Sequence, residues 1–147
     1  MSPIILSVDD DEEDQMLFTE AFADKALDCR LVCVTNGPAC FRYLSQTIQL
    51  PALILLDLNL PGMNGFEILR QLRIAPQWKS IPVVVLSTTR SEEQINQVYG
   101  AGANSFLTKP NDFKDLIHMA GVLCSDWLTV IKRPANVSGD EIKLITF

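Results

Sequence analysis

Five short, almost continuously apolar runs constrain the fold of this chain more than any other feature of its sequence. Each run is rich in Ile, Val and Leu, has the length of a β-strand and is followed by a longer segment with helical spacing. Strands buried on both faces are continuously apolar, whereas half-exposed strands alternate polar and apolar residues. The pattern therefore predicts an α/β fold with a doubly wound, five-stranded parallel sheet. The predicted strands are 4–8, 31–34, 52–56, 83–86 and 104–107, and the predicted helices are about 12–24, 38–47, 65–75, 92–100 and 112–127.

The size of the chain fits one domain. Its 147 residues, 48% of them hydrophobic, are enough for one ordinary core. We expect a domain over residues 3–128 and a C-terminal tail over residues 129–147. The tail includes a short apolar piece at 142–147, which we interpret as an added edge strand or a docking segment.

Charge and hydropathy exclude several classes of function. The chain has 12 Lys and Arg against 18 Asp and Glu, and it has no basic run that would neutralise nucleic-acid phosphates. We therefore expect no direct nucleic-acid binding. The N-terminus lacks the basic flank of a signal peptide, and no apolar run reaches membrane-spanning length, so we expect a cytoplasmic protein with no membrane contact.

The cysteines do not suggest a metal site. Cys29, Cys33, Cys40 and Cys124 form no CxxC pair, and the chain has one histidine. Because thiols stay reduced in the cytoplasm, we expect all four to be free and buried or half-buried.

Polar chemistry gathers where the predicted strands end. Asp9 and Asp10 follow the first strand, Asp57 follows the third, Ser87 follows the fourth and Lys109 follows the fifth. Ligands of doubly wound sheets bind beyond the carboxyl ends of the strands. We therefore expect these five side chains to share one site.

The acidic cluster after the first strand has two interpretations. Glu12, Glu13 and Asp14 are accounted for by the favourable interaction of carboxylates with a helix N-terminus. Asp9 and Asp10 lie closest to the strand end, where they would repel Asp57 by several kcal/mol unless a divalent cation held them. Mg²⁺, which prefers oxygen ligands, fits this position.

Each remaining site residue is ambiguous when taken alone. Asp57 closes the most hydrophobic strand, but a strand-end Asp is also a common N-cap or turn residue. Pro61-Gly62 predicts a tight turn after it, which would bring the Asn59 carbonyl toward the same cation. The Ser87 hydroxyl and Lys109 ammonium suit a phosphoryl group, though both residue types end many strands. Together these residues predict a phosphoryl-transfer site.

In the order and spacing of every element, residues 3–127 resemble the receiver domains of bacterial two-component response regulators. The acidic pair falls on Asp9 and Asp10, the phosphorylated aspartate on Asp57, the hydroxyl on Ser87 and the lysine on Lys109. The resemblance implies a flavodoxin-like receiver fold. It also implies a protein that is not an enzyme beyond its own phosphorylation and dephosphorylation.

The resemblance further implies roles for individual residues. Asp10, Asp57 and the Asn59 carbonyl would ligate Mg²⁺ directly, and Asp9 would act mainly through water. Phe106 falls at the switch aromatic position, where its ring would turn inward when Ser87 moves toward the phosphoryl group; ordinary core packing is the alternative.

One backbone feature also follows from the resemblance. The peptide bond between Lys109 and Pro110 would be cis, which would aim the lysine into the site.

The partners implied are a sensor histidine kinase or phosphotransfer protein and a downstream protein. The downstream protein would bind the face formed by the fourth predicted helix, the fifth strand and the fifth helix, with a homodimer as a further possibility. No DNA-binding or enzyme domain follows, so the chain resembles stand-alone regulators, including those associated with phytochrome kinases.

Two alternatives stay open at this level. A phosphatase of the haloacid-dehalogenase type also forms an aspartyl phosphate, but that family has a second Asp two residues after the nucleophile, where this chain has Asn59. A pseudo-receiver would keep the fold without the chemistry. Turnover of phosphate esters would reveal the first, and absence of Mg²⁺ binding would reveal the second.

Overall fold

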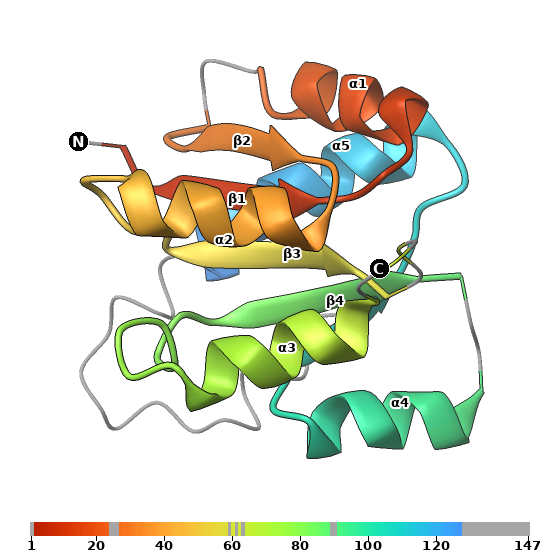
Figure 1. Ribbon diagram of the computed structural model, residues 1–147. Helices are drawn as coiled ribbons and strands as arrows, with labels where there is room; N and C mark the ends of the chain where they lie inside the picture. Colours follow the sequence, from red (N-terminus) through yellow and green to blue (C-terminus); the bar gives the residue numbers. More distant parts are fainter. Residues whose placement is uncertain are drawn as a thin grey trace.

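In the computed structural model, the five apolar runs form one parallel sheet with the strand order β2-β1-β3-β4-β5 (Figure 1). The structure describes residues 2–23, 27–58, 60, 62, 64–88 and 91–127. The α/β prediction is confirmed, and every predicted strand lies within one residue of its observed bounds. The strands are β1 (Ile4–Val8), β2 (Arg30–Val34), β3 (Leu53–Asp57), β4 (Val83–Ser87) and β5 (Ser105–Thr108), and the helices are α1 (Glu12–Ala21), α2 (Gly37–Gln46), α3 (Gly65–Ile74), α4 (Glu92–Gly100), α5 (Phe113–Gly121) and a π-helical turn η1 (Val122–Trp127).

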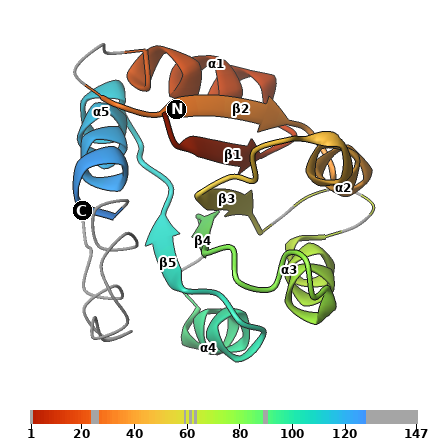
Figure 2. The same ribbon diagram turned by 90° about the vertical axis from the view of Figure 1, so that its left-hand side faces the viewer.

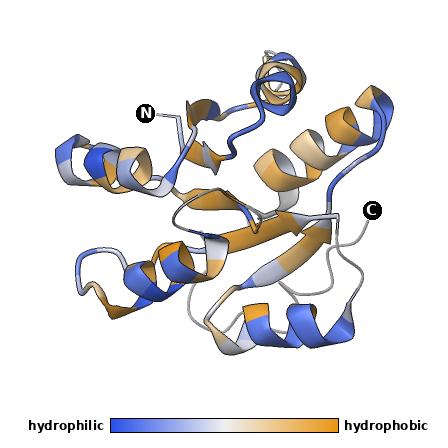
Figure 3. Cartoon of the chain, turned by 45° about the vertical axis from the view of Figure 1, so that its right-hand side comes forward, coloured by the Kyte–Doolittle hydropathy of each residue, from blue (hydrophilic) through white to orange (hydrophobic). Residues whose placement is uncertain are grey.

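Helices cover both faces of the sheet, which explains why the central strands are continuously apolar. Helices α1 and α5 pack on one face, and α2, α3 and α4 pack on the other (Figure 2). Alternate residues of β3 serve the two cores, because Leu55 packs beneath α1 and α5 while Ile54 and Leu56 pack beneath the other three helices. Figure 3 shows the hydrophobic strands at the centre and hydrophilic residues on the outer surfaces of the helices.

Each of the helices α1 to α5 begins at a polar N-cap residue. In every case the cap side chain accepts a hydrogen bond from the backbone N–H three residues further on, which satisfies one of the free donors of the first turn. All strands are parallel, so these helix starts lie at the carboxyl edge of the sheet. The N-caps are Asp11, Asn36, Asn64, Ser91 and Asp112.

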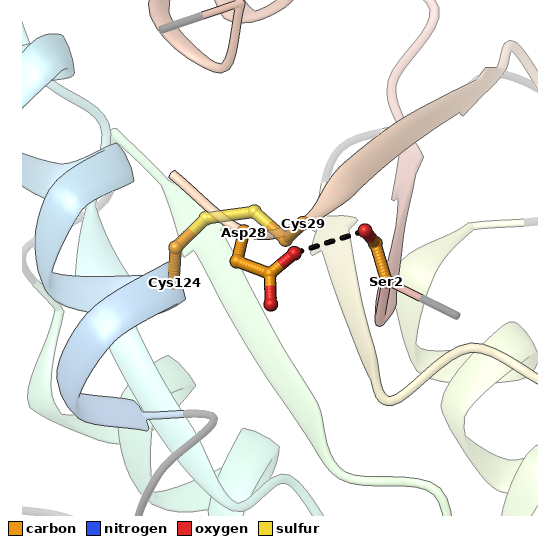
Figure 4. Close-up of a disulfide and its surroundings, with 4 residues drawn as sticks. All are labelled: Ser2, Asp28, Cys29 and Cys124. Carbon is orange, nitrogen blue, oxygen red and sulfur yellow. Dashed lines mark hydrogen bonds between the residues drawn. A yellow bond between two sulfur atoms is a disulfide. The ribbon is translucent and has the colours of Figure 1, made fainter. Parts of the chain in front are cut away.

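A disulfide links the start of β2 to the end of the α5 region, so the prediction of four free thiols is wrong. Cys29 and Cys124 are 95 residues apart in the sequence, and their Cα atoms lie 6.2 Å apart (Figure 4). They meet because α5 and η1 pack over the sheet and end beside the entry into β2. Cys33 is free and exposed, whereas Cys40 is free and buried, and burial raises the pKa of its thiol to about 12.

The predicted tail and the absence of a membrane span are the two remaining expectations about the chain as a whole. The predicted tail, residues 129–147, lies outside the described residues. Within the described ranges, the helices are too short or too polar to cross a lipid bilayer.

Candidate functional site

Three carboxylates from two neighbouring strands converge at the carboxyl edge of the sheet. Asp9 and Asp10 follow β1, Asp57 ends β3, and one oxygen from each lies within 4.8 Å of the others. Asp9 is 2% exposed and Asp57 is 7% exposed, whereas Asp10 is exposed to solvent. The expected convergence is therefore present, with two of its three acids removed from water.

Hydrogen bonds from three elements fix the position of Asp9. Its backbone N–H donates to the Val34 carbonyl at 3.1 Å, and its Oδ1 accepts from the Asp11 N–H at 3.0 Å. The buried side chain of Gln15 donates from Nε2 to the carbonyls of Asp9 and Val34, both at 3.0 Å. Because α1 supplies Gln15, the packing of that helix orients the acidic loop.

A glycine brings α3 close to the strand that carries Asp57. The Gly65 N–H donates to the Leu58 carbonyl at 3.1 Å. A Cβ at position 65 would lie 2.8 Å from both the Asp57 carbonyl oxygen and the Leu58 Cα. The helix can start this close to the site because residue 65 has no side chain.

Lys109 reaches the acidic group from the end of β5. Its Nζ lies 3.2 Å from Asp9 Oδ2, 3.1 Å from Asp14 Oδ2 and 3.3 Å from Asp57 Oδ2. Its backbone N–H donates to the Ser87 carbonyl at 3.0 Å, which joins the ends of β4 and β5. One cation is thus shared by three carboxylates.

The electrostatics of the site follow from burial and mutual repulsion. Burial, with a smaller contribution from the Asp57 charge, raises the pKa of Asp9 from its usual 3.8 to about 6, although Lys109 and a backbone hydrogen bond oppose this effect. Burial alone would lower the pKa of Lys109, but the carboxylates of Asp57 and Asp9 raise it above its usual value. Lys109 therefore stays an ammonium while the acidic group still carries excess negative charge.

The residues present fit a divalent cation. The set consists of carboxylate oxygens, which hard cations such as Mg²⁺ prefer, and desolvation and repulsion at Asp9 are costs that a bound cation would offset. The third acid of the run, Asp11, is the N-cap of α1, and its side chain accepts the Asp14 N–H at 3.1 Å. The triad therefore consists of Asp9, Asp10 and Asp57.

The other predicted site residues are placed as follows. Ser87 is fully buried at the end of β4, beside the β5 terminus that carries Lys109. Phe106 is half-buried, packs against the core beneath α4 and donates its backbone N–H to the Tyr99 hydroxyl at 3.1 Å. Asn59 lies outside the described residues.

The expected cis peptide is wrong. No cis bond occurs in the described parts of the chain, which include Lys109 and Pro110. With this bond trans, the Lys109 ammonium still lies 3.1–3.3 Å from the carboxylates of Asp9, Asp14 and Asp57, so a cis bond is not needed to aim it into the site.

Two site residues were not found by sequence reasoning. Asp14 was assigned to the helix N-terminus alone, yet it contacts Lys109. Gln15 was not singled out, although its position on the buried face of α1 is the signal that could have found it.

Comparison with known proteins agrees with this geometry. Residues 5–121 match the family described as the response regulator receiver domain. The response regulator Rcp1 of Synechocystis is 36% identical over 137 residues, which cover 90% of this chain and 93% of that protein.

Solved structures show the same likeness. The Mn²⁺-bound form of Rcp1 superposes with a TM-score of 0.77 at 36% identity, covering 90% of this chain and 99% of that one. The phosphorylated cyanobacterial phytochrome response regulator RcpA gives a TM-score of 0.77 at 32% identity, covering 86% and 96%.

A flavodoxin-like parallel sheet with an acidic triad and a lysine at its carboxyl edge defines the receiver class of signalling protein. The chain belongs to the response regulator receiver family of two-component systems. It is thus a non-enzymatic signalling protein with a triad of the kind that binds metal in receivers, and the family implies a histidine kinase as partner. This assignment sets the phosphatase alternative aside.

Proposed function

We propose that Asp57 accepts a phosphoryl group from a phosphohistidine of a sensor histidine kinase or phosphotransfer protein, in a Mg²⁺-dependent reaction. The observation that carries this proposal is the position of Asp57, at the end of a buried strand and 3.3 Å from the Lys109 ammonium. The similarity to RcpA, solved in a phosphorylated form, supports the same role and favours a kinase of the phytochrome type.

In the proposed transfer, an Asp57 carboxylate oxygen forms a bond to phosphorus as the phosphorus–nitrogen bond of the donor breaks. The imidazole leaves with the electron pair of that bond and takes up a proton. Lys109, which stays charged because acids surround it, stabilises negative charge on the phosphoryl oxygens. The product is an acyl phosphate on Asp57.

Asp10 and Asp57 are the proposed direct protein ligands of Mg²⁺, with the Asn59 carbonyl as a third and Asp9 acting mainly through water. The bound ion would neutralise charge on the phosphoryl group during transfer. The loop that carries Asp9 and Asp10 supports this arrangement, because hydrogen bonds from Asp11 and Gln15 hold the loop in place beside Asp57.

The proposed output is a change in the surface formed by α4, β5 and α5. Ser87 would move toward the new phosphoryl oxygens, and Phe106 would turn inward behind it. The Phe106 backbone is tied to Tyr99 of α4, so movement of β5 would be transmitted to that helix. A downstream protein, or a second copy of the chain, would bind the changed surface.

The central test is phosphoryl incorporation from acetyl phosphate with Mg²⁺, followed by intact-protein mass spectrometry. Wild type should gain one phosphoryl group, and Asp57→Asn should gain none. Asp115→Asn, which removes an exposed carboxylate of α5, is the matched control and should label like wild type. Equal labelling of Asp57→Asn and wild type would refute the assignment.

A second measurement separates this function from that of a pseudo-receiver. Isothermal titration of the metal-free protein with Mg²⁺ should show saturable binding that Asp10→Asn weakens. A protein that keeps its fold and binds no Mg²⁺ would instead be an interaction module.

A further inference from the structure

Asp14 contacts the site through Lys109. Its Oδ2 lies 3.1 Å from Lys109 Nζ, the shortest of the three ion pairs of that lysine. Among the described residues, the acids close enough to share an ion are Asp9, Asp10 and Asp57, and Asp14 is outside that group. Asp14 is thus a partner of the lysine and stands apart from the metal ligands.

Local hydrogen bonds fix Asp14 relative to the acidic group. Its backbone N–H donates to the Asp11 carboxylate at 3.1 Å, and the Asp11 N–H donates to the Asp9 carboxylate at 3.0 Å. The side chain of the next residue, Gln15, is buried and donates a hydrogen bond to the Asp9 carbonyl. These hydrogen bonds fix the first turn of α1, and with it the backbone of Asp14, relative to the acidic group.

The exposure of the three carboxylates distinguishes their roles. The side chain of Asp14 is 34% exposed, against 2% for Asp9 and 8% for Asp57. Under the proposed function, Asp57 carries the phosphoryl group and Asp9 faces the metal. Asp14 then contacts neither the phosphoryl group nor the metal, so it can keep its contact with Lys109 throughout transfer.

We propose that Asp14 is a positioning residue that holds the Lys109 ammonium over Asp57 from the solvent side. This inference rests on the proposed phosphoryl transfer and deepens it. An isolated exposed ion pair would contribute little, but here the shared lysine couples α1 to the end of β5 across the reacting carboxylate. Loss of Asp14 would leave Lys109 with two partners, both of which change their interactions during transfer.

The first test compares Asp14→Asn with Glu13→Gln, which removes an equal charge from an exposed neighbour in the same turn. Phosphorylation is measured over a range of acetyl phosphate concentrations at saturating Mg²⁺. Both variants reduce repulsion of the anionic donor, so both should lower its half-saturating concentration. Asp14→Asn alone should lower the maximal rate, by about fivefold or more. Equal maximal rates in the two variants would overturn the proposal.

A double-mutant cycle tests whether the effect passes through Lys109. Asp14→Asn is measured again in the Lys109→Ala background, where its effect on the maximal rate should fall to less than about twofold. An effect of the same size in both backgrounds would mean that Asp14 acts by another route and would also overturn the proposal.

A third readout does not depend on phosphorylation. The labelling rate of Lys109 by an amine-reactive reagent is followed by peptide mass spectrometry in metal-free protein. It should rise in Asp14→Asn and stay unchanged in Glu13→Gln; an unchanged rate in both variants would refute the contact. If wild type accepts no phosphoryl group, the proposed function fails, and this labelling result still decides whether Asp14 holds Lys109.

Discussion

The two edges of the sheet are stabilised in opposite ways. At the carboxyl edge, Asp9 and Asp57 are buried beside Asp10, and one lysine offsets part of their repulsion. At the amino edge, the Cys29–Cys124 disulfide closes a long loop, and beside it the Ser2 hydroxyl donates to Asp28 at 2.9 Å (Figure 4).

This contrast separates the sources of stability from the site of chemistry. Buried negative charge is concentrated at the edge where a cation and a phosphoryl group would bind, whereas the disulfide and an exposed hydrogen bond to Asp28 lie at the opposite edge. Variants at the amino edge should therefore change stability without changing the site. Variants at the carboxyl edge should change both.

The largest expected effect is at the amino edge. The Cys29→Ser/Cys124→Ser protein should lose about 4 kcal/mol of unfolding free energy, because the disulfide restricts the unfolded chain across a 95-residue separation. Urea unfolding measures this loss, and phosphorylation with Mg²⁺ should stay at the wild-type level. Cys33→Ser, which removes an exposed free thiol, is the control. Equal stability of the two proteins would show that the link does not support the fold.

The next effect lies at the carboxyl edge, where a substitution, Asp9→Asn, should increase the unfolding free energy instead of lowering it. A carboxyl group whose pKa is higher in the folded than in the unfolded protein destabilises the fold once it ionises. At about 1.4 kcal/mol per pH unit, the rise at Asp9 from 3.8 to about 6 corresponds to up to about 3 kcal/mol. Metal-free wild type should lose this stability as the pH increases through that range, and Asp9→Asn should not.

Urea unfolding in a chelator at pH 4 and at pH 7 measures this difference. Mg²⁺ should stabilise wild type at pH 7 more than it stabilises Asp9→Asn, which keeps Asp10 and Asp57 but has no buried charge at residue 9 for the ion to offset. Asp28→Asn, at the amino edge, removes an exposed carboxylate and serves as the control. A variant less stable than wild type at pH 7 without metal would contradict the proposed cost of the acidic group.

A third variant tests the close approach of α3 to the site. Gly65→Ala places a Cβ 2.8 Å from the Asp57 carbonyl oxygen, so the backbone must shift at a cost of about 2 kcal/mol. The same shift should slow phosphorylation. Gly100→Ala, where a Cβ meets nothing within 4 Å, should cost no stability and leave phosphorylation unchanged. Stability is measured by thermal unfolding, and phosphorylation by acetyl phosphate labelling. The same stability and labelling rate in Gly65→Ala and Gly100→Ala would exclude steric crowding at residue 65.

The smallest expected effect compares two N-caps. Asn64→Ala should cost about 1 kcal/mol, the usual value of a lost cap. Asp11→Ala should cost less in metal-free protein, because removal of its charge also relieves repulsion within the acidic loop. Unfolding with and without Mg²⁺ measures the difference between the stability losses of the two variants. This difference should become smaller when the metal is bound, because the metal also relieves the repulsion. A larger loss for Asp11→Ala without metal would reverse this interpretation.

Much of the site was predictable because parallel strands share a direction. Residues after each apolar run must lie at one edge, so Asp9, Asp57 and Lys109 were expected to meet. Which acid of the run would be buried was harder to predict. Asp9 turns inward, while Asp11 caps α1, and this choice depends on how that helix packs.

The missed contacts share a physical cause. Asp14 and Gln15 are adjacent in α1, yet one reaches Lys109 and the other supports the Asp9 loop. The docking angle of the helix on the sheet sets these directions, and helical periodicity does not encode it. The Cys29–Cys124 pair is similar, because 95 residues of intervening chain leave no local signal of the pairing.

The sequence by itself determined the order of strands and helices, the parallel sheet and the types of residue at its carboxyl edge. These features depend on hydrophobic periodicity and on residues a few positions apart, which any stretch of chain carries locally. Only the tertiary structure decided that Lys109 is shared by three acids, that Asp9 is desolvated and that Cys29 reaches Cys124. Each of these depends on the packing of α1 and α5 against the sheet, which brings together side chains far apart in the chain and removes them from water.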